Sequence, residues 1–183
     1  MKGLRLFALG ILSISSAAFA FDPYGVCHLN NETVDSMVCY GPAVLKDATI
    51  KGDVKVSGAL TGTNINSNAV MSGGAANLKD STIKGLADIN GDLDANHVDF
   101  GHGLLVTANH IRLNASSVVG SIVVDIDNEH SPQVYLECGS TVSGNVEFKG
   151  KKAGLVQVTD DSLVKGKVIN GTMEFVRKIC DKK

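Results

Sequence analysis

The chain has 183 residues, 44% of them apolar, and a formal net charge of −2 at pH 7. It has 20% charged residues, 20 glycines and no tryptophan, which excludes an intrinsically disordered chain and predicts many short strands joined by tight turns. The mild acidity gives no electrostatic basis for nucleic acid binding, so nucleic acid is not an expected partner.

Residues 1–20 have the pattern of a secretory signal peptide. Lys2 and Arg5 precede a mostly apolar run over residues 6–14, and the tripeptide ending at Ala20 supplies small residues for cleavage. The run is too short to cross a bilayer core of about 30 Å, and we expect no transmembrane segment in the mature chain. We predict export to the periplasm, the outer surface or the medium. A buried N-terminal helix or a retained anchor is the alternative.

Four cysteines in an exported chain favour disulfides and allow three pairings. Similar flanking residues favour Cys27 with Cys39, which leaves Cys138 with Cys180. The first bond would make residues 21–41 a two-stranded clip that caps the N-terminal end, and it would contribute about 3 kcal/mol. The second would tie the basic C-terminal tail, residues 177–183, to the body. Free, buried cysteines are the alternative.

Residues 42–176 carry an internal repeat. Leu45–Gly52 reads LKDATIKG and Leu78–Gly85 reads LKDSTIKG, so the two segments differ at one position. Looser copies follow at Leu113–Gly120, Leu136–Gly144 and Val158–Gly166. A repeat of this kind predicts a stack of similar coils. Every copy closes on a glycine, and these are Gly52, Gly85, Gly120, Gly144 and Gly166.

The residues after each glycine alternate between apolar and polar, which indicates strands with one buried face. We therefore predict an all-β, single-domain parallel β-helix (β-solenoid) with disulfide-stapled ends. A β-sandwich is the alternative, but it does not explain a recurring octapeptide. Glycine intervals of 24 and 22 fit one coil each, whereas 33 and 35 fit two coils of about 17 or one coil with an insertion. Directly stacked Lys46 and Lys79 would repel, which favours two coils.

The glycines are expected to mark a corner that needs a positive φ, or a place without room for a side chain. The segment over 168–176 is predicted as a last strand pair that Cys180 ties down. Capped ends would favour a discrete particle over an endless fibre.

The Ile/Val-x-Gly-x-Val repeats resemble those of bactofilins, which are bacterial polymer-forming proteins with a β-helix core. They are also similar to small exported β-helix proteins of the Legionella and Coxiella type. Those proteins join a signal peptide, an early cysteine pair, repeats of this kind and a Gly-Pro-Ala entry, present here at Gly41–Ala43. The resemblance implies the fold and no catalytic residues. The export signal and the cysteines argue against a cytoskeletal role.

A search for chemistry predicts no catalytic, cofactor-binding or metal-binding residues. His97, His102, His110 and Asp99 share one stretch, but their spacing matches no zinc site. Segments 92–96 and 125–129 alternate acidic residues, but the first has His97 and Gly103 where a calcium loop needs glycine and glutamate. The chain has no C-x-x-C, Gly-x-Ser-x-Gly or phosphate-loop motif.

We predict a non-enzymatic exported β-solenoid that acts as a structural, self-associating or surface-interaction module through its flat polar sheet faces. A second copy, a protein or a glycan surface would be its partner. The first alternative is a carbohydrate-binding or carbohydrate-active β-helix, which would use Arg112, Asp92 and Asp94. Aromatic residues suited to a sugar are few, with Phe100 and Tyr135 in the middle of the repeat. The second alternative is a secreted factor that binds a host protein.

Overall fold

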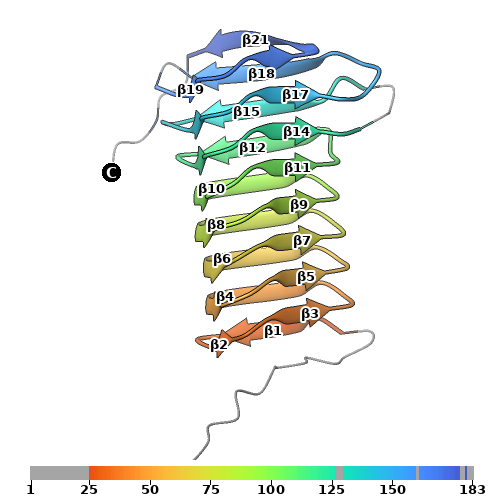
Figure 1. Ribbon diagram of the computed structural model, residues 1–183, viewed down its shortest axis with the longest axis vertical. Coiled ribbons are helices and arrows are strands. Elements are labelled where there is room, and N and C mark those ends of the chain that lie inside the picture. The colour runs from red at the N-terminus through yellow and green to blue at the C-terminus, as the bar shows by residue number, and fades with distance from the viewer. Residues whose placement is uncertain (1–24, 127–129, 160, 178–179, 181–183) are drawn as a thin grey trace, which may run out of the picture.

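The computed structural model describes residues 25–126, 130–159, 161–177 and 180 (Figure 1). Within these residues all regular structure is β-strand, and parallel strands stack into a β-solenoid of about nine coils. The predicted all-β parallel β-helix is confirmed. The expected signal peptide, residues 1–20, lies outside the described residues. The described segments hold no helix long and apolar enough to cross a membrane.

Each coil contributes strands to two parallel sheets that face each other across the core (Figure 1). The first, the long sheet, contains β1 (Cys27–Asn30), β2 (Thr33–Val34), β4 (Ala43–Ile50), β6 (Leu60–Ser67), β8 (Ala76–Ile83), β10 (Leu93–Phe100), β12 (His110–Asn114), β13 (Ser117–Val118), β15 (Gln133–Glu137), β16 (Thr141–Val142), β18 (Gly154–Thr159), β19 (Leu163–Val164) and β21 (Gly171–Val176). The second, the short sheet, contains β3 (Met37–Cys39), β5 (Val54–Val56), β7 (Val70–Ser72), β9 (Ala87–Ile89), β11 (Leu104–Val106), β14 (Ile122–Val124), β17 (Val146–Phe148) and β20 (Val168–Ile169).

The strand register places the two near-identical octapeptides two coils apart. Leu45 pairs with Gly62, and Gly62 pairs with Leu78. The next glycine interval also spans two coils, because β8 pairs with β10 and β10 pairs with β13. The last two intervals span one coil each. The two-coil interpretation is therefore confirmed, and β6 and β10 belong to the intermediate coils.

Alternation along the strands buries one residue in two. The long strand β4 follows a pattern in which Ala43, Leu45, Ala48 and Ile50 are buried and most of the intervening residues face solvent. Equivalent apolar residues stack from coil to coil at about 4.8 Å, the spacing of hydrogen-bonded strands. The core is narrow as a result, and it is filled mainly by Val, Ile, Leu and Ala. Phe100 lies inside this core and is fully buried, so it is not a surface aromatic.

The long strands bend at a column of residues in the left-handed backbone conformation. A φ between 47° and 55° occurs at the bend of successive coils, in Asn31, Asp47, Asn64, Asp80, His97, Ala115 and Cys138. Asn and Asp adopt this conformation more readily than most residues. The Asn64 Nδ2 donates to Asp47 Oδ1 at 2.8 Å, so an amide separates the carboxylates of Asp47 and Asp80. The predicted two-coil separation of like charges is realised in this column.

The five repeated glycines do not have a positive φ, and that part of the expectation is wrong. Among the described glycines only Gly139, at +83°, lies in the left-handed region. The alternative is correct, because a side chain at the repeated positions would meet the neighbouring coil. A Cβ on Gly52 would lie 2.7 Å from the carbonyl oxygen of Asp35, and one on Gly85 would lie 2.8 Å from that of Asn68.

Both favoured disulfides are present. Cys27 and Cys39 are bonded with their Cα atoms 6.1 Å apart, and Cys138 and Cys180 with theirs 5.4 Å apart. Residues 27–39 do not form a separate clip, however. β1 pairs in parallel with β4, and β3 pairs with β5 in the other sheet. The segment is thus the first coil of the solenoid, and its disulfide joins the two sheets of that coil.

Candidate functional site

The C-terminal end of the solenoid exposes apolar side chains. Met173 and Phe175 of β21 are 43% and 70% exposed, although they are in register with the buried Val156 and Val158 of β18. Val176 of β21 is 38% exposed, and Val164 and Val168 before it are half-buried. We call this surface the C-terminal face, and it consists of Val164, Val168, Met173, Phe175 and Val176. Leu163 and Ile169 are also exposed, but they pair with the outward-facing Thr141 and Glu147 and so lie on the side of the solenoid.

The C-terminal face exists because β21 is the last described strand of the long sheet. It pairs with β18 along one edge, and no described strand pairs along the other (Figure 1). The disulfide of Cys180 does not cover this face. Its partner Cys138 follows β15, two coils earlier, so the bond anchors Cys180 to the side of the solenoid. Among the described residues, the expected cap is missing at this end.

The N-terminal end is closed. Leu29, Val34 and Met37 of the first coil are all buried, and the Cys27–Cys39 bond links β1 to β3 among them. The apolar side chains exposed here are Val26 and Tyr40, which flank the coil. The two ends of the solenoid therefore differ, and the expectation of a capped end holds for this one.

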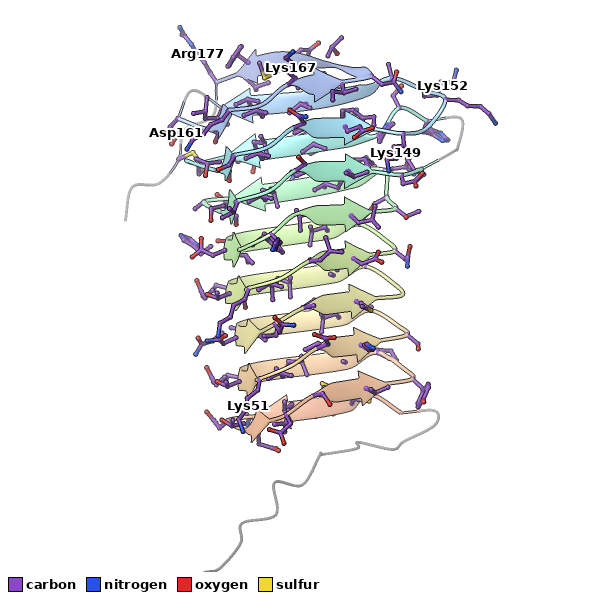
Figure 2. The ribbon with its side chains drawn as sticks, viewed as in Figure 1. Lys51, Lys149, Lys152, Asp161, Lys167 and Arg177 are labelled. Atoms are coloured by element: carbon purple, nitrogen blue, oxygen red, sulfur yellow. A yellow bond between two sulfur atoms is a disulfide. The ribbon has the colours of Figure 1, made fainter. Side chains whose placement is uncertain are left out.

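The two ends also differ in charge. Residues 147–183 contain nine Lys and Arg against five Asp and Glu, whereas residues 21–146 contain six against fourteen. Figure 2 shows Lys152, Lys167 and Arg177 projecting from the last coils. At the other end, Glu32 is exposed, and Asp35 pairs with Lys51 at 2.9 Å. The basic end is thus the one with the exposed apolar residues.

A second candidate site is a shallow groove on the outer surface of the long sheet, with a volume of about 420 Å³. It crosses the N-terminal parts of β6, β8, β10 and β12 and reaches Tyr135 in the middle of β15. Its floor is apolar, and its rim carries polar and aromatic side chains. The floor and rim residues are Leu60, Ala75, Ala76, Asn77, Asp92, Leu93, Asp94, His110, Arg112 and Tyr135, which together define the rim groove.

Two side-chain contacts order the rim. The His110 Nδ1 lies 3.8 Å from Asp92 Oδ2, and the His110 backbone amide donates to Asp92 Oδ1 at 3.2 Å. The Arg112 guanidinium lies 5.8 Å from the centre of the Tyr135 ring, and its Nε lies 3.8 Å from Glu137 Oε2. Cation–π contacts of this length are favourable, so the arginine and the tyrosine orient each other.

The structure brings together some of the residues that the sequence analysis singled out and separates others. Asp92, Asp94 and Arg112 meet in the rim groove, and His110 joins them. His97 lies at the bend, 3.9 Å from Asp80, and His102 lies beyond β10. The described residues contain no group of three His, Cys, Asp or Glu placed to hold a metal ion. Of the segment 125–129, residues 127–129 lie outside the described residues.

The role of Tyr135 in the groove and the exposure of Phe175 were not predicted. Both depend on the coil length, because Tyr135 lies beside Arg112 only if a coil of 23 residues joins them. A complete coil assignment would have revealed both residues.

Comparisons with protein-family models, with curated proteins and with solved structures find no match. The fold therefore defines the protein as a disulfide-bonded parallel β-solenoid, and its function has to be inferred from its surfaces.

Proposed function

We propose that this chain is an exported, non-enzymatic β-solenoid that works as a self-associating structural module. In this proposal the C-terminal face of one copy binds the N-terminal end of a second copy. One observation carries the proposal. Phe175 is 70% exposed at a position of the coil that is buried in every earlier coil, as in Leu45, Leu78 and Leu113.

Burial of the C-terminal face would be favourable. Covering one large apolar side chain typically contributes about 1.5–3 kcal/mol, and this face presents three exposed ones, Met173, Phe175 and Val176. The outer edge of β21 also presents backbone groups that a further parallel strand can pair with. A β-strand of a neighbouring copy would therefore cover the apolar side chains and form hydrogen bonds with the free backbone edge of β21.

Charge favours the N-terminal end of a second copy over its C-terminal end. Two C-terminal faces would bring the Lys167 and Arg177 side chains of both copies together. The N-terminal coil instead offers the exposed Glu32 after β1 and the exposed Val26 and Tyr40 at the other end of that strand. Contacts between opposite charges at a rim select the partner and its orientation. A head-to-tail contact of this kind repeats from copy to copy and does not close on itself.

Other features support the structural part of the proposal. The recurring residues of the coil serve the fold, since the glycines make room for the neighbouring coil and the left-handed residues form the bend. Two disulfides are typical of proteins in oxidising, extracytoplasmic compartments, which supports export. Fractionation of the native cells tests this last point, and a cytoplasmic protein with reduced cysteines would contradict it.

The size and shape of residues 21–183, which contain every described residue, test self-association. We expect light scattering and negative-stain electron microscopy to show rods that lengthen with protein concentration. Higher salt should shorten them, because the screening length falls from about 10 Å at 0.1 M to about 3 Å at 1 M. A monomer at every concentration would contradict self-association. A dimer that does not grow would contradict the head-to-tail contact.

A further inference from the structure

The rim groove is hollow because side-chain size increases along one column of the long sheet. Ala75, Asp92 and His110 occupy equivalent positions in successive coils, each just before or at the start of a strand. The next outward column runs through Asn77, Asp94, Arg112 and Tyr135. Small side chains therefore form a hollow at one end, and long ones form a wall at the other.

The floor of the rim groove lies over Leu60, Ala75, Ala76 and Leu93, three of which are almost fully buried, and most of the exposed surface of the groove is apolar. An apolar floor with a few polar groups around it is the usual composition of a small-molecule site, and about 420 Å³ falls within the usual range of such sites. The floor is rigid, because three of these residues are buried in strands that pair on both sides.

The polar groups of the rim are planar and are available to a ligand. Asp94 and Asn77 are neighbours in the ladder, and neither side chain has a hydrogen-bond or ion-pair partner among the described residues. Each offers two atoms in one plane, and such pairs match two adjacent hydroxyl groups. Tyr135, held beside Arg112, adds an aromatic surface at the wall.

We propose that the rim groove binds a saccharide that is neutral or carries amino groups. A sugar ring has an apolar face of C–H groups, which fits the floor, and a rim of hydroxyls, which fits Asp94 and Asn77. The charge of the groove selects against acidic sugars. Asp92 and Asp94 supply two carboxylates, and the single arginine is already paired with Glu137 at 3.8 Å. This site lies on the side of the solenoid and is independent of the C-terminal face.

The experiment measures binding of three linear tetrasaccharides to the protein expressed as the full chain. The probes are a neutral N-acetylglucosamine tetramer, its de-acetylated amino form and an acidic galacturonate tetramer. Isothermal titration gives the affinity, and amide chemical shifts locate the contact. We expect the neutral or the amino tetramer to bind with shifts in β8, β10 and β12, and the acidic tetramer to bind at least tenfold more weakly.

Matched variants separate the groove from the rest of the surface. Asp94→Ala and Tyr135→Ala should each weaken binding about tenfold or more, since each removes a direct contact. Asp88→Ala on β9 of the short sheet and Tyr40→Ala at the N-terminal end should not. All four residues are at least partly exposed, so the variants should fold, and circular dichroism verifies this. Phe175→Glu should leave the affinity for sugar unchanged.

The proposal is overturned if none of the three tetramers binds at millimolar concentration. It is also overturned if the acidic tetramer binds best, or if Asp94→Ala and Tyr135→Ala bind sugar as well as the unaltered protein does.

Discussion

The backbone amide of Ile65 donates a hydrogen bond to the hydroxyl of Ser81 in the next coil, at 3.0 Å. The same hydroxyl donates to the carbonyl oxygen of Lys79 at 2.6 Å. Ser81 is buried just after the bend of its strand, where the left-handed Asp80 turns the backbone out of the regular ladder. Later coils use Ser116 and Ser140 in the same way, so the serine that distinguishes the two octapeptides closes the hydrogen bonds of the bend.

Ser81→Ala should destabilise the protein by about 1–3 kcal/mol, the usual cost of a buried donor that loses its partner. The Ile65 amide would keep its burial and lose its acceptor. Urea denaturation followed by circular dichroism measures the change, with the exposed Thr82→Ala as the control. An equal stability of the two variants would show that water replaces the hydroxyl.

Ser67→Ala should stabilise the protein, which is the opposite of the effect expected for Ser81→Ala. The Ser67 hydroxyl is buried and has no hydrogen-bond partner within the described structure, and its residue pairs with Ile83 in the next coil. A buried hydroxyl without a partner is costly, so its removal should stabilise the protein by about 1 kcal/mol. The same denaturation experiment checks this. A loss as large as that expected for Ser81→Ala would reveal a partner for this hydroxyl.

Substitution of asparagine for glycine at two positions should show whether a glycine is required because the neighbouring coil leaves no room for a side chain or because the backbone has a positive φ. At Gly144 a Cβ would lie 2.5 Å from the Ser121 hydroxyl and 2.7 Å from the Gly120 backbone, so Gly144→Asn should cost about 1–3 kcal/mol. At Gly139 nothing lies within 4 Å of a Cβ, and asparagine tolerates a positive φ, so Gly139→Asn should be nearly neutral. Thermal unfolding of the two variants gives the comparison, and equal melting temperatures would contradict it.

Phe175→Glu should abolish the association of copies, because it places a charge in the centre of the C-terminal face. Val119→Glu provides a matched control on the side of the solenoid, where Val119 is 61% exposed. Sedimentation velocity at several concentrations should give a monomer for the first variant and the unaltered distribution for the second. If both variants associate like the unaltered protein, the contact lies elsewhere.

Replacing Cys27 and Cys39 together by serine should destabilise the protein by about 3 kcal/mol, since the bond closes a loop of 12 residues. The first coil has a neighbouring coil on one side only, so we expect its amides to exchange with deuterium first. Hydrogen exchange measured by mass spectrometry shows which coils lose protection of their amides. Uniform loss of protection along the whole solenoid would mean that the chain unfolds as one unit.

Local patterns accounted for much of the fold. The octapeptides and the period-two alternation predicted a parallel β-solenoid, because stacked coils place equivalent residues in equivalent environments. The pairing of Cys27 with Cys39 also followed from their similar neighbours. The two-coil intervals required intermediate rungs, and these are β6 and β10. They do not resemble the octapeptide, because a coil needs only buried positions, such as Gly62, and a bend, such as His97.

By itself the sequence predicted the fold class and favoured the two-coil interval and the disulfide pairs, since each depends on periodicity or spacing along the chain. Only the tertiary structure decided which side chains are neighbours on the surface and which apolar side chains are exposed. Arg112 and Tyr135 are 23 residues apart and become neighbours through the register of two coils. Phe175 occupies a position that is buried in the earlier coils, and it is exposed because no described strand lies beyond β21. An inward-facing side chain of a solenoid is fully buried only when a further coil covers it, and the local sequence does not show whether that coil is present.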